Sequence, residues 1–216
     1  MITGAARGIG KTISVWFARE DADVAINDIK KEELEKTAQE IRGYGNRVHT
    51  YVCDVSKADQ VARMVEGVIA DLGKVDILVN NAGIALPTRF FDLSEDEWDR
   101  VLNINLKGAF LVSRATLKHM KERNYGRVIM ISSISGRTGG VLTGLHYDIS
   151  KAGLIVMARR LAREFGAYGI TVNAVAPSFA ETEMLRDLNI DTDEKKKATA
   201  ELNVIKRLAT PDDIAN

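Results

Sequence analysis

Short apolar runs alternate along this chain with longer amphipathic segments, and this alternation limits the folds that the chain can adopt. Each apolar run is too short for a helix, and apolar residues in the segments between them recur at helical spacing. Strands that alternate with helices predict a parallel sheet covered by helices on both faces. We therefore expect an α/β fold with a doubly wound parallel sheet in three α/β/α layers. The expected strands cover residues 24–28, 48–52, 75–79, 128–131 and 170–175. The expected helices cover residues 9–20, 31–44, 57–72, 98–121 and 147–165.

The composition favours one domain over residues 1–216 and excludes several classes of partner. The 30 Lys and Arg residues balance 30 Asp and Glu residues, so charge gives no reason to expect nucleic acid or an acidic membrane. No apolar run approaches the roughly 18 residues of a membrane span. Cys53 is the only cysteine, which excludes an internal disulfide and fits a cytoplasmic chain.

Three glycines, Gly4, Gly8 and Gly10, directly precede an amphipathic helix that is expected to run to about residue 20. Glycines permit a tight turn and a close approach of the backbone to a ligand. The helix N-terminus behind them offers free N–H groups and a positive dipole to a pyrophosphate. The alternative is a glycine-rich turn without a ligand, and the spacing is not Gly-x-Gly-x-x-Gly.

Polar residues also end the next expected strands. Asp28 lies about 20 residues past the glycines, where a nucleotide-binding fold places a carboxylate against the ribose hydroxyls. Its alternative is a loop residue that starts the next helix. Asp54 follows the strand at 48–52, and Asn81 lies in a turn after the strand at 75–79. The Asn and Gly residues of that turn either serve only to form the turn, or the turn is also the floor of a cofactor groove.

Two helices carry further signals. Ser56 is a candidate N-cap for the helix at 57–72, and Ser94 opens a capping box with Glu97. The helix at 98–121 contains Asn105, a poor interior helix residue. We therefore expect a helix irregularity there that carries a polar group inward.

Tyr147 and Lys151 are four residues apart in an expected helix, so their side chains leave the same face. An ammonium at roughly 4 Å, at an effective dielectric near 20, favours the phenolate by about 4 kcal/mol. That energy corresponds to roughly 3 pKa units and would bring the tyrosine towards 7, where it acts as a general acid or base. The alternative is a solvated helix face. A histidine placed as His146 is more often structural or on the surface than catalytic. No cluster has metal-ligand spacing, so we expect no metal.

Taken together in this order, the motifs resemble those of the classical short-chain dehydrogenases/reductases, over nearly all of the chain. Within the family, the similarity leans towards two branches, the 3-oxoacyl-(acyl carrier protein) reductases and the sugar or polyol dehydrogenases, without choosing between them. It implies a Rossmann-like fold and an NAD(P)-dependent enzyme that transfers a hydride between a nicotinamide and an alcohol or ketone. The residues that carry it are Thr3, Gly4, Gly8, Ile9, Gly10, Asp54, Asn80, Asn81, Ala82, Gly83, Asn105, Ser133, Tyr147, Lys151, Asn173 and Pro177.

The resemblance also implies roles. Tyr147 would donate or accept the proton, Lys151 would lower its pKa and hold the nicotinamide ribose, and Ser133 would hydrogen-bond the substrate oxygen. Asn105 would hold a water that links Lys151 to solvent. The implied cofactor contacts are Gly4, Arg7, Gly8, Ile9, Gly10, Asp28, Asp54, Val55, Asn81, Ala82, Gly83, Tyr147, Lys151, Pro177 and Thr182.

Asp28 favours NAD over NADP because a carboxylate repels a 2′-phosphate, whereas Arg7 in the glycine turn argues weakly for NADP.

Family members commonly pair through the helices at 98–121 and 147–165, so we expect a homodimer or homotetramer. The substrate pocket is expected from residues 84–95, 134–146 and 178–205, the last forming a mobile, partly helical lobe.

The chain departs from the family pattern in two places. Ser178 stands where the family has glycine, and Ala180 where it has a β-branched residue, which weakens the expected carboxamide contacts. The expected first strand is short and a last strand is missing. A truncated inactive form and a non-catalytic nucleotide-binding module are therefore the alternatives to an enzyme.

Overall fold

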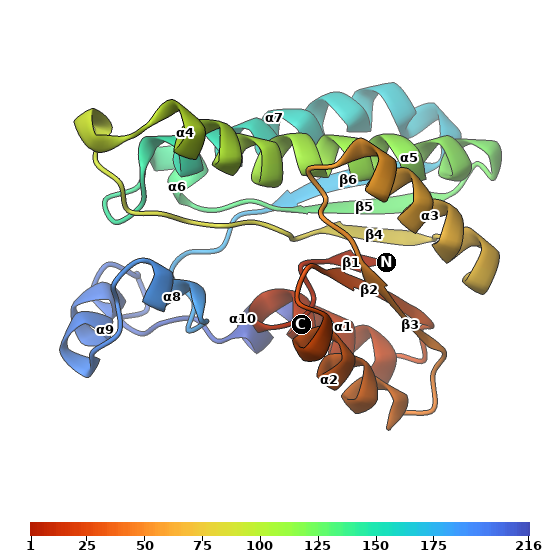
Figure 1. Ribbon diagram of the computed structural model, residues 1–216, viewed down its shortest axis with the longest axis horizontal. Helices are drawn as coiled ribbons and strands as arrows, with labels where there is room; N and C mark the ends of the chain where they lie inside the picture. Colours follow the sequence, from red (N-terminus) through yellow and green to blue (C-terminus); the bar gives the residue numbers. More distant parts are fainter.

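The computed structural model describes residues 1–216 and has three layers, with a parallel sheet between two layers of helices (Figure 1). The sheet has six strands in the order β3-β2-β1-β4-β5-β6. This confirms the predicted doubly wound α/β fold. The strands are β1 (Ile2–Thr3), β2 (Val24–Asp28), β3 (Val48–Val52), β4 (Ile77–Asn80), β5 (Gly126–Ile131) and β6 (Ile170–Val175).

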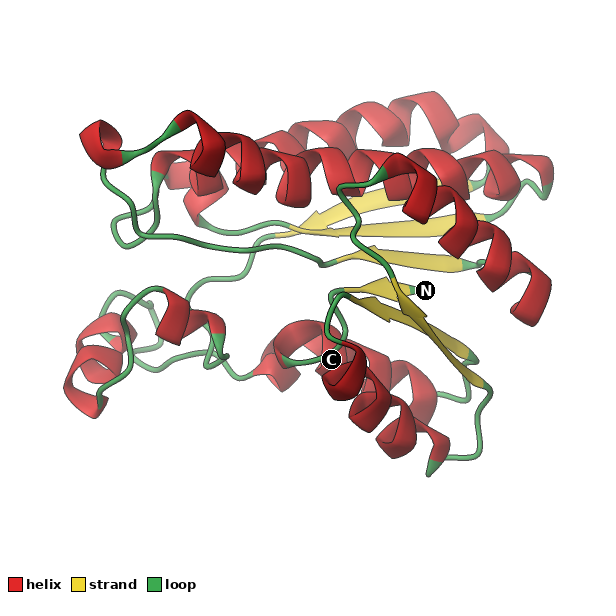
Figure 2. Ribbon diagram, viewed as in Figure 1, coloured by secondary structure: helices red, strands yellow, loops and turns green.

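Helices cover both faces of the sheet, as Figure 2 shows. One face carries α1 (Gly8–Arg19), α2 (Lys31–Arg42) and α10 (Pro211–Ala215). The other carries α3 (Ala58–Leu72), α4 (Glu95–Leu102), α5 (Gly108–Glu122) and α7 (Leu145–Phe165). Short helices complete the chain: α6 (Ser135–Thr138), α8 (Met184–Asp187), α9 (Asp193–Ala200) and the 3₁₀ turns Phe90–Asp92 and Gly166–Tyr168. None of the helices has the length and apolar character that crossing a membrane requires.

The strand order reverses between β1 and β4, and this point locates the ligand groove. Ile2 pairs with Ile26 of β2 on one side and with Val79 of β4 on the other. From there the chain winds outwards to β3 in one direction and to β6 in the other. In open parallel sheets ligands bind beyond the carboxyl ends of the strands at such a reversal. The glycine turn after β1 and the turn after β4 meet there.

Two apolar clusters hold the layers together. Leu78, Met120 and Leu154 belong to the cluster between the sheet and the α3, α5 and α7 layer. Ile26 and Leu34 belong to the cluster between the sheet and the α1 and α2 layer. Because central parallel strands bury both faces, they read as continuous apolar runs rather than as alternating ones.

Some local predictions held and others did not. The helix predicted at 98–121 is interrupted by a π-helical turn, Asn103–Lys107, which confirms the irregularity expected at Asn105. The Ser94 hydroxyl accepts from the Glu97 N–H, but the reciprocal half of the capping box is absent. The prediction of Ser56 as an N-cap was wrong. The N-cap position of α3 is Lys57, which makes no side-chain cap, and the Ser56 N–H donates to the Asp54 carboxylate.

Candidate active site

The glycine turn is pressed against the end of β4, and this contact requires glycine. Gly4 has a φ of +64°, and a Cβ there would lie 2.7 Å from the Ala82 Cα. A Cβ at Gly10 would lie 2.2 Å from the Gly4 carbonyl oxygen. The Asn81 side chain donates to the carbonyls of Thr3 and Gly4 at 3.0 and 2.9 Å. Asn81 thus ties the two strand ends together at the floor of a groove.

A cavity of about 390 Å³ opens above this floor and brings together most of the predicted cofactor residues. Gly10 lies behind the turn rather than in the cavity wall. Pro177, Tyr147 and Lys151 line an adjoining cavity instead. The predicted residues in the first cavity wall are Gly4, Arg7, Gly8, Ile9, Asp28, Asp54, Val55, Asn81, Ala82, Gly83 and Thr182.

The chemistry of this groove fits a dinucleotide. Helix α1 begins at Gly8 with no side-chain cap from Arg7, so its first N–H groups are available to an anion. The Asp28 carboxylate ends β2 and accepts from the N–H groups of Ala6 and Lys30, both at 3.1 Å. Asp28 takes part in no ion pair, so its charge is free to attract hydroxyl donors of a ribose. A pyrophosphate at Gly8 and a ribose at Asp28 match these groups.

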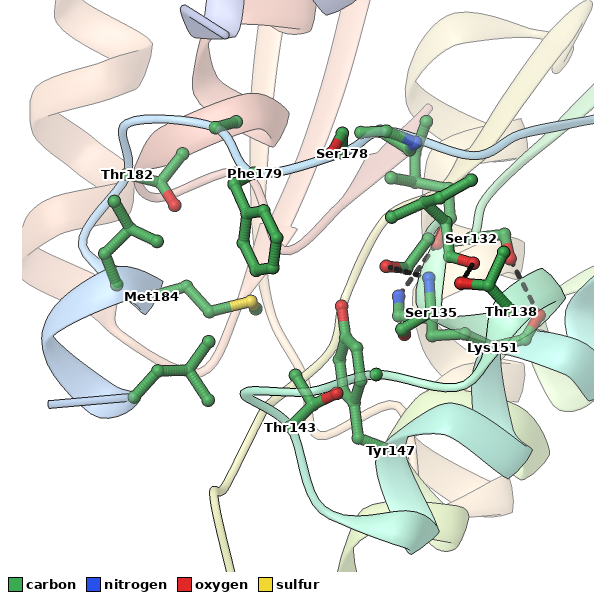
Figure 3. Close-up of a pocket in the computed structure, with 18 of the residues that line it drawn as sticks. Ser132, Ser135, Thr138, Thr143, Tyr147, Lys151, Ser178, Phe179, Thr182 and Met184 are labelled. Atoms are coloured by element: carbon green, nitrogen blue, oxygen red, sulfur yellow. Dashed lines mark hydrogen bonds between the residues drawn. The ribbon is translucent and has the colours of Figure 1, made fainter. Parts of the chain in front are cut away.

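The adjoining cavity has a volume of about 290 Å³ and carries the predicted reacting side chains. Ser133, Tyr147 and Lys151 lie on one wall. Figure 3 shows the Tyr147 ring projecting towards Phe179 and Met184 on the opposite wall. The two cavities share a boundary formed by Ile9, Asn81, Thr182 and Met184. The groove and the cavity that holds Tyr147 therefore adjoin along these residues.

Tyr147 is protonated at neutral pH in this environment. The side chain is 7% exposed, and burial raises its pKa to about 12, an effect that the nearby Ser133 hydroxyl only partly offsets. The prediction of a pKa near 7 was therefore wrong. It placed an ammonium next to the phenol, whereas the Lys151 Nζ lies 5.6 Å from the ring centroid. Desolvation of the phenolate is the larger effect.

Lys151 is buried without a carboxylate partner. Its Nζ donates to the Ile131 carbonyl at 2.8 Å, and burial lowers its pKa to about 8. Gly83 lies beside it, and a Cβ built there would be in ordinary contact with the Nζ at 3.5 Å. The Ser132 hydroxyl donates to the Lys151 carbonyl at 2.7 Å and fixes α7 against β5. Ser132 is thus a structural residue here.

Asn105 is fully buried in the π-helical turn, and its amide is largely occupied by protein groups. It accepts from the Ile84 N–H at 2.9 Å, and its Nδ2 donates to the Ile84 carbonyl and to the Ser150 hydroxyl. One acceptor position of Oδ1 is left for a water. The π turn directs this side chain from the α4–α5 layer towards Ser150 of α7.

His146 is also buried, with its Nε2 3.1 Å from the Glu97 carboxylate. This pair joins the first turn of α7 to the first turn of α4. The position agrees with the structural role predicted for His146.

The predicted substrate segments are only partly correct. Residues 134–143 and 178–202 supply cavity walls, but no residue of 84–95 lines the cavity that holds Tyr147. Ala85 instead packs in an apolar cluster with Tyr147, Leu185 and Leu188. The apolar wall of Phe179, Leu185 and Leu188 lies within the predicted segment 178–205, although the sequence did not single out these side chains. Sequence reasoning also missed Asp187, which lines the groove.

Comparison with known proteins agrees with this geometry. The family model described as short chain dehydrogenase matches residues 1–193. A 3-oxoacyl-[acyl-carrier-protein] reductase from Thermotoga maritima is 39% identical over 216 residues, covering all of this chain and 86% of that protein. The (2S)-[(R)-hydroxy(phenyl)methyl]succinyl-CoA dehydrogenase subunit of Thauera aromatica is 40% identical over 216 residues, covering all of this chain and 85% of that protein.

Solved structures agree as well. A putative short-chain alcohol dehydrogenase from Sinorhizobium meliloti superposes with a TM-score of 0.93 at 34% identity, covering 99% of this chain and 84% of that one. The chain belongs to the short-chain dehydrogenase/reductase family of oxidoreductases. Its relatives include proteins of the 3-oxoacyl-[acyl-carrier-protein] reductase type.

Proposed function

We propose that this protein is an NAD(P)-dependent oxidoreductase that interconverts a ketone and an alcohol, with Tyr147 as the general acid and base. The observation that carries the proposal is the shared boundary between two cavities. One presents the glycine turn and Asp28, and the other presents Ser133, Tyr147 and Lys151. The family membership supports the same reaction class.

Residues of this chain would hold the cofactor along the groove. The α1 N-terminus at Gly8 would bind the pyrophosphate, Asp28 the adenosine ribose, and Lys151 the nicotinamide ribose. Pro177 and Thr182 line the side of the adjoining cavity where the nicotinamide would lie. When bound, the nicotinamide supplies or accepts the hydride at the substrate carbon.

The proton step belongs to the protein. In the reducing direction the protonated Tyr147 donates its phenolic proton to the carbonyl oxygen as the C=O bond becomes a C–O–H group. The Ser133 hydroxyl donates a hydrogen bond to that oxygen, where negative charge develops. Lys151, charged below its pKa of about 8, stabilises the phenolate that remains. Asn105 would hold the water that returns a proton from solvent. Oxidation of the alcohol runs through the same groups in reverse.

The cavity wall supports a substrate with an apolar substituent. Phe179, Leu185, Leu188 and Leu202 from residues 178–205 face Tyr147 across the cavity. This segment would act as the substrate-binding lobe of one domain that spans residues 1–216. The two relatives named above act on acyl groups attached to acyl carrier protein or to CoA. We therefore include a 3-oxoacyl group on such a carrier among the substrates to test.

We further propose NAD as the preferred cofactor, because the Asp28 carboxylate, which has no ion-pair partner, would repel the 2′-phosphate of NADP.

Pairing into a homodimer or homotetramer is supported by exposed apolar side chains on the two long helices: Phe110 on α5 and Val156 on α7 are 44% and 63% exposed. A cytoplasmic location is supported by Cys53, which is buried and unpaired.

The function is tested by titrating the chain with NADH and NADPH and following nucleotide fluorescence. Acetoacetyl-CoA is then added to the saturated protein, and loss of NADH absorbance is followed. The proposal predicts saturable binding and loss of absorbance in proportion to the alcohol formed. Binding without turnover of any ketone or alcohol would favour the non-catalytic module, and failure to bind either nucleotide would contradict the proposal.

A further inference from the structure

An ion pair crosses the cofactor groove and joins its floor to the lobe above it. The Arg7 guanidinium, in the glycine turn, lies 3.6 Å from the Asp187 carboxylate at the end of α8. Both residues line the groove. The side chains are 39% and 48% exposed, so the pair is open to solvent and weakly held. An exposed ion pair of this kind breaks readily when a ligand presents a more strongly interacting charged group to either side chain.

Two of the three basic residues in the groove wall are occupied by acidic partners, while Asp28 itself has none. Arg7 pairs with Asp187, and the Lys30 ammonium lies 3.1 Å from Glu33. Arg100 reaches the groove from α4, on the other face of the sheet. The groove wall carries four acidic and three basic side chains, so it is negative overall. The charged residues in the groove wall are Arg7, Asp28, Lys30, Asp54, Arg100, Glu183 and Asp187.

We propose that Asp187 is a specificity residue that biases the groove towards the cofactor without a 2′-phosphate. It does so by holding the Arg7 guanidinium on the lobe side. This inference rests on the proposed nicotinamide-dependent function. A 2′-phosphate carries between one and two negative charges and needs a basic partner, preferably an arginine that donates two hydrogen bonds. An arginine already neutralised by Asp187 attracts that phosphate less strongly. Asp187 thus acts in the same direction as Asp28, from a different element.

Asp187 acts through Arg7, and this distinguishes it from a residue that only holds the lobe over the groove. A residue with that structural role would change the affinity for both nucleotides by the same factor. A specificity residue changes the ratio of the two dissociation constants, and only while Arg7 is present. Glu183 supplies a matched control, since its carboxylate lies 3.4 Å from where a Gly8 Cβ would stand, it lines the same groove, and it takes part in no ion pair. Glu183→Gln removes one charge without freeing Arg7.

The experiment measures dissociation constants of NADH and NADPH for the full chain at low ionic strength. The variants are Asp187→Asn, Arg7→Gln, the double variant and Glu183→Gln. We expect Asp187→Asn to lower the ratio of the NADPH constant to the NADH constant by about 2- to 5-fold, the upper part of the range of an exposed ion pair. The double variant should show no such change relative to Arg7→Gln. Added salt should reduce the effect because it screens exposed charges.

Two results would overturn the inference while leaving the proposed function intact. The first is an unchanged ratio in Asp187→Asn, including the case in which both constants change by the same factor, and the second is a change of ratio that persists without Arg7. A Glu183→Gln shift as large as that of Asp187→Asn would also overturn it, because a general loss of charge would then explain both. If neither nucleotide binds the unaltered chain, the proposed function fails first and this inference fails with it.

Discussion

The β5–α7 corner and the 178–205 lobe face each other across the same cavity, but they are held in place differently. In the corner, Lys151 and Ser132 are buried and hydrogen-bonded to backbone carbonyls of the neighbouring elements. The lobe contributes Leu185 and Leu188 to a small apolar cluster, and its charged side chains form exposed ion pairs. The difference suggests that the corner fixes the chemistry, while the lobe selects what reacts.

Loss of the Ser133 hydroxyl should produce the largest effect among the variants that sharpen this comparison. Ser133→Ala removes the donor to the developing oxyanion and should lower kcat by about 10²- to 10³-fold. Steady-state kinetics with NADH and a ketone would measure it. Ser133→Thr, which keeps a hydroxyl, should retain more activity. Equal losses in the two variants would show that the hydroxyl is not the group that matters.

Asn105 should matter more for stability than its proposed water-holding role alone would require. Asn105→Ala leaves both backbone groups of Ile84 without their partner and should lower the free energy of unfolding by about 3 kcal/mol. Urea denaturation would measure it. Asn103→Ala, in the same π turn and without a side-chain hydrogen bond, should cost under about 1 kcal/mol. Similar costs for the two variants would contradict this account of the turn.

Lys151 should cost stability at neutral pH, and the cost should fade as pH rises. Burial lowers its pKa to about 8 from 10.5, so between these values the unfolded chain binds more protons and the free energy of unfolding rises with pH. Lys151→Met should therefore stabilise the fold by roughly 2 kcal/mol at pH 7, with the gain shrinking towards pH 10.

The matched control is Lys118→Met on the exposed face of α5, which should change little at any pH. Melting curves should stop at pH 10, because the raised pKa of Tyr147 lowers stability above it. A gain from Lys151→Met that does not depend on pH would contradict the proposed cause.

The lobe should give the smallest effect, and it should appear in KM. Leu185→Ala removes part of the apolar wall and should raise KM for an apolar ketone several-fold, with about 1 kcal/mol of binding lost and little change in kcat. Val204→Ala, at a 95% exposed position in the same lobe, is the control. A larger loss in kcat than in KM would place Leu185 with the catalytic corner and break the comparison.

Sequence reasoning was most successful where a residue's environment is set by local geometry. The order of apolar runs and helices predicted the three layers, and the poor helix former Asn105 marked the π turn. The glycines, Asp28 and Asn81 were brought together because parallel strands end at one edge of the sheet.

The failures concern distances and burial between elements that are far apart in the sequence. Spacing of four residues placed Tyr147 and Lys151 on one face but did not reveal how deeply both are buried, so the pKa direction for Tyr147 was wrong. The Arg7–Asp187 pair joins elements separated by most of the chain. Within residues 84–95, Ala85 is buried in the apolar cluster that includes Tyr147, while Phe90 and Phe91 are exposed. Neither packing leaves a periodic signal.

The central claim is that Tyr147 moves the proton, and a paired substitution tests it most directly. Turnover of NADH with a reducible ketone and the dissociation constant for NADH would be measured for Tyr147→Phe and for Tyr125→Phe, a 42% exposed tyrosine just before β5. The account predicts a loss of kcat of about 10²- to 10⁴-fold for Tyr147→Phe at unchanged NADH affinity, and no loss for Tyr125→Phe. Full turnover by Tyr147→Phe with intact NADH binding would contradict it.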